Sequence, residues 1–256
     1  MYKLPEWWGA EKPYKMLDCL IGIKNIPDGS IDLILIDPPY GITGESWDTE
    51  PNWKELSPEL YRVLKSSGIL IIFGTFQSLM NFNLNRDAFA FRTEYIWEKE
   101  KSVWTSNNLP IKVHEIIHIY SKGTPAKEHM DMIRLPGEPY LKKQMKSKTR
   151  GFGVMDVKNN GGRHPRSVLH FNTAGADGEM GIGIISPKPT KLLEILIRAY
   201  SDEGDVVLDT FLGSGSTIWA CRRKSRIGLG FEIRKECEPM IMKRWMENTP
   251  ELDTYV

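Results

Sequence analysis

The four consecutive residues Asp37-Pro38-Pro39-Tyr40 offer the clearest chemistry in the sequence. The carboxylate of Asp37 and the carbonyl of Pro38 can together accept hydrogen bonds from both hydrogens of an amino group. An exocyclic amine of a base is a poor nucleophile because its lone pair is delocalised into the ring, and two such acceptors would favour a tetrahedral nitrogen. The paired prolines fix the backbone before a substrate arrives, and Tyr40 offers a flat face for stacking an extruded base. We therefore predict all four as catalytic residues, against the alternative of a plain turn that closes a strand.

A second motif covers residues 209–217, with the sequence Asp-Thr-Phe-Leu-Gly-Ser-Gly-Ser-Thr, between an apolar run and a helical one. Its glycines allow close backbone approach, and the start of the following helix favours a negative group such as a carboxylate. Glu232 ends the next expected strand, where nucleotide-binding folds place an acid for ribose hydroxyls. The loop lacks the Gly-Lys-Ser/Thr ending of a phosphate-binding NTPase loop, and Ile218 stands where the dinucleotide pattern has its third glycine. Alone it is also compatible with an ordinary strand-to-helix turn; together with residues 37–40 it predicts a cofactor pocket.

Short apolar runs must position both motifs. Residues 31–36 and 69–73 are almost wholly apolar and rich in β-branched side chains, which is typical of strands buried on both faces of a parallel sheet. Further strands are expected at 95–97, 116–120, 206–208 and 227–231, and helices at 52–64 and 192–200. This alternation predicts an α/β fold with a doubly wound, mostly parallel sheet, at whose carboxyl edge ligands bind.

The character of the chain changes over residues 122–183, where glycines and polar residues are dense and periodicity is weak. We predict an irregular insertion for target recognition, between a catalytic half (1–121) and a cofactor-binding half (184–256). Its basic residues would contact DNA, with lysines on phosphates and arginines on guanine edges. The residues assigned to this role are Lys142, Lys143, Lys146, Arg163 and Arg166. The alternative for any one of the lysines is a solvated charged face.

Composition sets broad limits. The chain has 256 residues, 41% of them hydrophobic and 26% charged, with a formal net charge of +1. These values fit one α/β domain and do not suggest disorder. The three cysteines are widely spaced and form no cluster with metal-ligand spacing, so we expect no metal and a reducing, cytoplasmic location. The first residues do not resemble a signal peptide, and no apolar run is long enough to span a bilayer.

The sequence resembles the β class of S-adenosylmethionine-dependent DNA amino-methyltransferases, the family that methylates adenine N6 or cytosine N4 and carries the catalytic tetrad before the cofactor loop. The resemblance extends over most of the chain. It includes the segments 18–20, 37–41, 47–48, 97–99, 114–117, 164–168, 188–189 and 209–217. It implies S-adenosylmethionine as cofactor and double-stranded DNA as substrate, with the target base extruded from the helix. Since related enzymes often dimerise, a homodimer is expected by analogy.

The resemblance also implies roles for individual residues. Asp18 would contact the adenine of the cofactor, and Ser216 and Thr217 would hold its methionine end. The full set assigned to cofactor binding is Asp18, Cys19, Asp37, Lys188, Asp209, Phe211, Gly213, Ser214, Gly215, Ser216, Thr217 and Glu232. Two departures stand out: of the family's His-Pro-Thr-Gln-Lys-Pro segment only Lys-Pro at 188–189 is present, and Thr210 replaces the usual proline.

Several alternatives stay open at this point. Asp rather than Ser at the first tetrad position favours adenine N6, but the same grip would serve cytosine N4. A protein or RNA methyltransferase would also use this chemistry, although enzymes that modify protein glutamine carry Asn-Pro-Pro-Tyr after the cofactor loop. A non-catalytic DNA-binding subunit of a paired methyltransferase would tolerate loss of the motifs, and both are intact. His114 and Glu115 are interpreted as structural because they begin an apolar strand.

Overall fold

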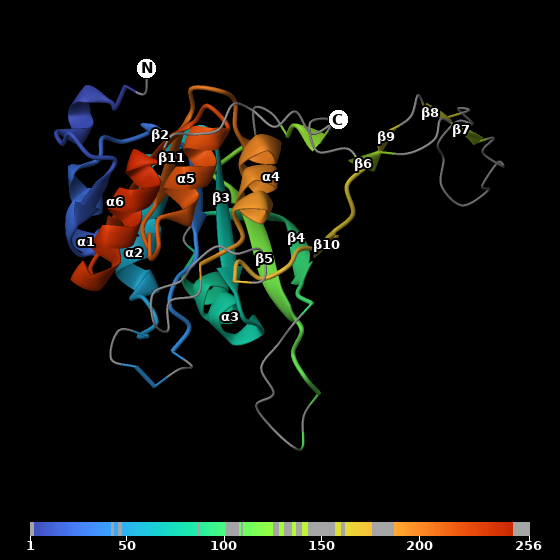
Figure 1. Ribbon diagram of the computed structural model, residues 1–256, viewed down its shortest axis with the longest axis horizontal. Helices are drawn as coiled ribbons and strands as arrows, with labels where there is room; N and C mark the ends of the chain where they lie inside the picture. Colours follow the sequence, from blue (N-terminus) through green and yellow to red (C-terminus); the bar gives the residue numbers. More distant parts are fainter. Residues whose placement is uncertain are drawn as a thin grey trace.

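The computed structural model describes residues 3–41, 44–45, 48–86, 88–100, 108, 110–124, 128–130, 135–136, 140–142, 157–159, 162–175 and 187–247. An eight-stranded sheet runs through the body in the order β1-β12-β11-β2-β3-β5-β4-β10 (Figure 1). In this order the strands are β1 (Tyr14–Met16), β12 (Ile227–Glu232), β11 (Val206–Asp209), β2 (Ile31–Ile36), β3 (Leu64–Gly74), β5 (His114–Ser121), β4 (Ala90–Glu98) and β10 (Val168–His170).

Six α-helices and three short 3-10 helices occur among the described residues. The α-helices are α1 (Cys19–Gly22), α2 (Trp53–Val63), α3 (Phe76–Asn85), α4 (Thr190–Tyr200), α5 (Ser216–Arg223) and α6 (Glu238–Met246). The 3-10 helices are η1 (Glu6–Trp8), η2 (Ile23–Asn25) and η4 (Lys235–Cys237). None of the helices in this part of the chain is long and apolar enough to cross a membrane.

The predicted fold class is confirmed. Every neighbouring pair in the sheet is parallel except those of β5, which runs antiparallel to both β3 and β4. Each strand and helix expected from the apolar runs is present, several of them longer than expected. The strand predicted at 69–73, for example, is the end of β3.

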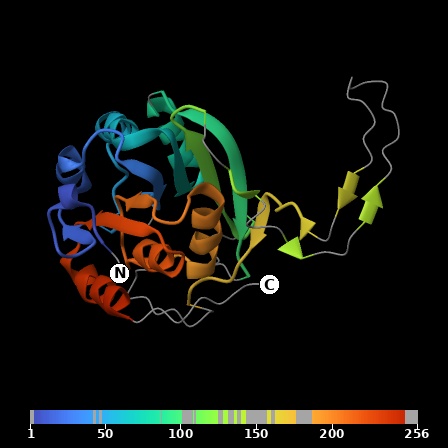
Figure 2. The ribbon, with the colours of Figure 1, turned by 90° about the horizontal axis from the view of Figure 1, so that it is seen from above.

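The sheet is buried on both faces because its central strands carry apolar side chains on both sides. In β2, Ile34 and Ile36 pack into one cluster together with side chains of α2 and α3. Leu33 and Leu35 point the other way, into a cluster that includes side chains of α4 and α5. Helices therefore cover both faces (Figure 2), which is the doubly wound arrangement.

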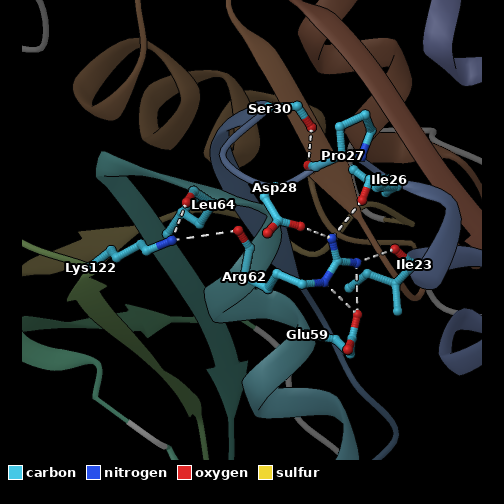
Figure 3. A network of polar contacts seen from close by, with 9 residues as sticks. All are labelled: Ile23, Ile26, Pro27, Asp28, Ser30, Glu59, Arg62, Leu64 and Lys122. Atoms are coloured by element: carbon cyan, nitrogen blue, oxygen red, sulfur yellow. Dashed lines mark hydrogen bonds and ion pairs between the residues drawn. The ribbon is translucent and has the colours of Figure 1, made fainter.

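The amino edge of the sheet, where β2 begins, is held by a polar network centred on Arg62 of α2 (Figure 3). Its guanidinium donates to the carbonyls of Ile26 (2.8 Å) and Ile23 (2.9 Å) and pairs with Asp28 at 2.5 Å and Glu59 at 2.7 Å. The ammonium of Lys122 donates to the carbonyl of Leu64 at 2.8 Å. This edge is thus fixed by cross-links between segments far apart in the sequence.

The predicted insertion, 122–183, contains more strand than expected. Its described parts include two antiparallel pairs, β6 (Leu135–Pro136) with β9 (Gly162–Arg163) and β7 (Tyr140–Lys142) with β8 (Val157–Asn159). Both pairs lie on an arm that extends away from the body (Figures 1 and 2). In addition, β10 joins the main sheet beside β4, although it lies inside the predicted insertion. Strands of two or three residues are too short to show a periodicity, which explains why the sequence did not predict them.

Candidate active site

The parallel strands bring the two motifs to one edge of the sheet. β11 lies between β12 and β2, all three running in the same direction, so their carboxyl ends meet. Asp37 follows the last residue of β2, Asp209 ends β11 and Glu232 ends β12. β1 pairs with β12 with Met16 opposite Glu232, which brings Asp18 to the same edge. This is where open α/β sheets bind ligands, between strands whose connections lead in opposite directions.

A cavity of about 540 Å³ opens at this edge. It is lined by all four predicted catalytic residues, Asp37, Pro38, Pro39 and Tyr40. Eleven of the residues predicted to bind the cofactor also line it: Asp18, Cys19, Asp37, Lys188, Asp209, Phe211, Gly213, Ser214, Ser216, Thr217 and Glu232. The twelfth, Gly215, is not in the lining. The structure thus brings the tetrad and the glycine-rich loop into one shared space.

Within the tetrad, side chains and backbone fix one another. The Tyr40 hydroxyl donates to Asp37 Oδ1 at 2.5 Å, which ties the ring to the carboxylate. Asp48 Oδ1 accepts from the backbone N–H groups of Tyr40 (2.9 Å) and Gly41 (3.0 Å), so the turn after the prolines is held by a buried carboxylate. Burial, and then the charges of Asp37 and Glu115, raise the pKa of Tyr40 well above its ordinary value. Tyr40 therefore stays a neutral donor.

Four charged side chains alternate in sign next to the tetrad. Lys188 Nζ donates to Asp37 Oδ2 at 2.5 Å and lies 3.3 Å from Glu115 Oε2. Glu115 Oε1 in turn accepts from Lys99. Burial alone would lower the pKa of Lys188, but the carboxylates of Asp37 and Glu115 outweigh it and raise that pKa. Lys188 is therefore a permanent cation at the acceptor group of Asp37.

The glycine-rich loop is organised by two carboxylates. Asp209 accepts from the N–H of Phe211 at 2.9 Å and from the hydroxyl of Thr217 at 2.6 Å. Glu232 accepts from the N–H of Gly213 at 2.6 Å and from Arg234 twice, through its backbone N–H at 2.8 Å and its side-chain Nε at 3.1 Å. Because a carboxylate can accept about four hydrogen bonds, Glu232 keeps acceptor capacity for ligand hydroxyls in the cavity.

Behind this loop, Gly215 and Arg244 set its shape. Gly215 has φ +80°, and a Cβ there would lie 3.2 Å from the Cα of Ile241, so this position needs glycine. The buried guanidinium of Arg244 in α6 donates to the carbonyl of Ser214 (3.0 Å), to its hydroxyl (2.6 Å) and to the hydroxyl of Ser216 (2.6 Å). Gly215 therefore shapes the turn without lining the cavity.

Near the adenine end predicted for the cofactor, Asp18 caps α1. Its carboxylate accepts from the N–H of Leu20 at 2.7 Å. Burial, and then the charge of Asp18, raise the pKa of the Cys19 thiol to about 12, so this cysteine lines the cavity as a neutral group. Among the described residues there is no group of three or more His, Cys, Asp or Glu side chains arranged to hold a metal ion.

The titration of Asp209 gives a pH-dependent stability. Burial raises the pKa of Asp209 to about 7, although the hydrogen bonds from Thr217 and the Phe211 amide lower it. The folded chain thus keeps this proton at pH values where the unfolded chain, with an aspartate pKa of about 4, has lost it. Its contribution to stability is present below about pH 4 and is lost as the pH rises to about 7.

We expect the Asp209→Asn variant to be free of this loss, since an amide can accept from Phe211 and donate to the Thr217 oxygen. Between about pH 5.5 and pH 7 the wild-type free energy of unfolding should fall by roughly 2 kcal/mol relative to the variant. Urea unfolding of both ligand-free proteins at the two pH values measures the difference. An equal change in the free energy of unfolding of the two proteins between these pH values would contradict the raised pKa of Asp209.

The residues predicted to bind DNA lie away from the cavity or outside the described residues. Arg163 ends β9 and Arg166 precedes β10, and both side chains are exposed. Lys142 is the last residue of β7. Lys143 and Lys146 fall outside the described part of the chain. The DNA-binding role of all five residues stays a prediction.

Sequence reasoning missed three residues of the site. The sequence favours a structural role for Glu115, and the structure places it beside Lys188, because β5 runs antiparallel and therefore begins at the edge where its neighbours end. The only sequence signal was a charged residue at the start of an apolar run. The sequence gives no sign that Asp48 holds the turn after the prolines or that Arg244 of α6 holds the glycine-rich loop.

Comparison with known proteins gives a consistent result. A family model described as DNA methylase matches residues 31–243. The Type II methyltransferase M.HpaI of Haemophilus parainfluenzae is 28% identical over 234 residues, which cover 87% of this chain and 70% of that protein. The DNA adenine methyltransferase YhdJ of Escherichia coli (strain K12) is 27% identical over 259 residues, which cover 89% of this chain and 80% of that protein.

Solved structures share the fold. The PvuII DNA methyltransferase (cytosine-N4-specific) superimposes with a TM-score of 0.66 at 16% identity, over 93% of this chain and 87% of that one. The putative DNA modification methylase TTHA0409 of Thermus thermophilus, complexed with S-adenosyl-L-methionine, gives a TM-score of 0.61 at 23% identity, over 93% of this chain and 96% of that one. The strand arrangement around the cavity is thus one that other proteins also adopt.

Proposed function

The chain belongs to the DNA methylase family, whose model spans residues 31–243, and from this premise we propose that it methylates an exocyclic amino group in double-stranded DNA, adenine N6 by preference, with S-adenosylmethionine as the methyl donor. The observation that carries the proposal is the shared cavity lined both by Asp37, Pro38 and Tyr40 and by the loop that holds Gly213. An amine held by the first group faces a cofactor held by the second.

The cavity fits the cofactor by its donor and acceptor set. Glu232 is anchored by two backbone N–H groups and by the Arg234 side chain, and it keeps acceptor capacity for ribose hydroxyls. Ser216 and Thr217 begin α5, whose positive end suits the methionine carboxylate. The bound cofactor supplies an electrophilic methyl group on a positively charged sulfur. Around it, the neutral Cys19 thiol and the Phe211 ring provide apolar surface.

The tetrad then orients the target. The carboxylate of Asp37 and the carbonyl of Pro38 accept hydrogen bonds from the two amino hydrogens, and the nitrogen lone pair is directed at the methyl group. Tyr40, fixed by its hydrogen bond to Asp37, stacks on the extruded base. Catalysis by this arrangement is positioning and electrostatic, and no covalent intermediate with the protein is needed.

The projecting arm is the part of the chain that we propose to contact the target sequence. Arg163 and Arg166 are exposed at its base, and basic residues are frequent between β7 and β8. Arginine pairs well with guanine edges and with phosphates, so both contacts are available to this region. Because the proposed substrates, DNA and S-adenosylmethionine, occur inside cells, we propose a cytoplasmic location. We expect a homodimer by analogy.

The identity of the base is the finer part of this proposal. We expect that the purified chain, incubated with unmethylated DNA and labelled S-adenosylmethionine, incorporates label that is recovered as N6-methyladenine after digestion to nucleosides and mass spectrometry. Recovery as N4-methylcytosine would replace adenine by cytosine and leave the reaction class intact. DNA binding without any cofactor binding would instead favour the non-catalytic subunit and overturn the enzyme proposal.

A further inference from the structure

The Lys188 ammonium lies where a substrate amine would have to donate. Asp37 Oδ1 already accepts from the Tyr40 hydroxyl and Oδ2 from Lys188, each at 2.5 Å. An ammonium this close is a stronger donor than a neutral amine, because its hydrogen bond is charge-assisted on both sides. Lys188 therefore competes with the target base for Asp37.

Breaking the hydrogen bond between Lys188 and Asp37 would cost much free energy, because the ammonium is buried and cannot turn to water instead. The Lys188 side chain is only 12% exposed, and the ammonium lies 5.3 Å from the ring centroid of Phe73 and 5.9 Å from those of Tyr40 and Trp97. A buried cation that loses its hydrogen-bonded anion is strongly destabilised. A second carboxylate within reach is thus required if Lys188 is to give way.

Glu115 is the carboxylate within reach. Its Oε1 accepts from Lys99, and its buried Oε2 lies 3.3 Å from the Lys188 nitrogen, in an ion pair that lacks hydrogen-bond geometry. An oxygen with an ion-pair contact and no hydrogen bond still has acceptor capacity. A small movement of Lys188 toward Glu115 would turn this ion pair into a hydrogen bond.

From this geometry we propose that Glu115 is a positioning residue: when the amino group of the target base reaches Asp37, the Lys188 ammonium transfers its hydrogen bond from Asp37 Oδ2 to Glu115 Oε2. The inference rests on the proposed function, since it needs an amine at Asp37. In the absence of DNA, Lys188 holds the place of that amine and keeps the carboxylate oriented. With DNA bound, the charge stays paired and Asp37 is free to accept from the base.

The Glu115→Gln variant tests this exchange, because it keeps the shape of the side chain and removes its charge. We expect kcat for methyl transfer to unmethylated DNA to fall about tenfold or more. Without the Glu115 carboxylate, the Lys188 ammonium has no charged acceptor to replace Asp37 when the base arrives. The Kd for S-adenosylmethionine, measured by calorimetry, should stay unchanged. In a Lys188→Met background the same substitution should change kcat by less than about twofold, because no ammonium remains to be transferred.

Glu194→Gln is the matched control. Glu194 in α4 is another buried carboxylate between two cations, with Arg223 Nε at 2.5 Å and Lys224 Nζ at 2.9 Å, and it lies outside the lining of the cavity. Its loss should lower the melting temperature and leave kcat per cofactor-binding site unchanged. Glu115 is only structural if Glu115→Gln lowers the melting temperature and leaves kcat unchanged. The same conclusion follows if it lowers kcat equally in the wild type and in the Lys188→Met variant.

If the Lys188→Met background does not fold or turn over, Glu115→Asp decides the matter. This variant retains a carboxylate, so its kcat should exceed that of Glu115→Gln by about threefold or more, and equal rates would overturn the proposal. A wild-type chain that binds no cofactor or transfers no methyl group would contradict the proposed function itself, which is a different result.

Discussion

Replacement of Asp37 by alanine is expected to abolish measurable methyl transfer while the fold and cofactor binding are largely kept, since Lys188 retains Glu115 as an anionic neighbour. The substitution removes the charged acceptor of the target amine, the partner of the Tyr40 hydroxyl and the anion nearest Lys188. Loss of one preorganised hydrogen-bonding group at a reacting centre costs roughly 100- to 1,000-fold in rate, and here the remaining acceptor is a single carbonyl. Transfer of labelled methyl groups to DNA under cofactor saturation measures the effect.

A matched aspartate lies at the other end of the same strand. Asp32 in β2 pairs with Lys65 at 2.5 Å and accepts from the N–H of Val206 at 3.0 Å, so it resembles Asp37 in its partners but faces the opposite edge. Asp32→Asn should lower stability without lowering kcat. Full label incorporation by the Asp37→Ala protein would refute the role given to this residue, as would a rate loss of the same size in the Asp32 variant.

Replacement of Glu232 by glutamine should act on the cofactor and leave the chemical step alone. The carboxylate organises the loop through Gly213 and Arg234 and, by our proposal, binds the ribose hydroxyls. A charge-assisted hydrogen bond is worth about 1.5–3 kcal/mol, so the Kd for S-adenosylmethionine should rise roughly 10- to 100-fold. At saturating cofactor, kcat should approach the wild-type value.

Glu238 provides the control for this variant. It starts α6 six residues further along the chain, and its exposed side chain pairs with Lys12 at 3.4 Å. Glu238→Gln should leave the Kd unchanged, because an exposed ion pair contributes little. If Glu232→Gln lowers kcat at saturation and leaves the Kd as it was, the carboxylate acts on the reaction and not on the ribose.

Much of this site could be predicted because its residues directly follow strands that the sequence marks clearly. The apolar runs that become β2 and β11 identify two parallel strands, and parallel strands carry the residues at their ends, Asp37 and Asp209, to one edge. The order of residues within each motif then indicates what that edge binds. Prediction works here because local pattern and global fold agree.

The remaining residues depend on information that a local pattern lacks. The run 116–120 would look the same in a strand of either direction, so nothing in the sequence indicates that Glu115 lies beside Lys188. The contact between Arg244 and Ser216 links segments 28 residues apart, and a single sequence gives no measure of such pairings. The short strand β10 carries too few residues for a period to emerge.

The Arg62 network has a consequence for how the molecule moves. Backbone carbonyls of the segment before β2 are tied to α2 by Arg62, whereas the opposite end of β2 leads into loops that line a cavity. Amide hydrogens near Ile31 should accordingly exchange with solvent only when the whole domain unfolds, and those of the loops around Gly213 in smaller and more frequent openings. Molecules that bind in the cavity should then stabilise the loops at this end of the sheet, so that binding also raises the free energy of unfolding of the domain.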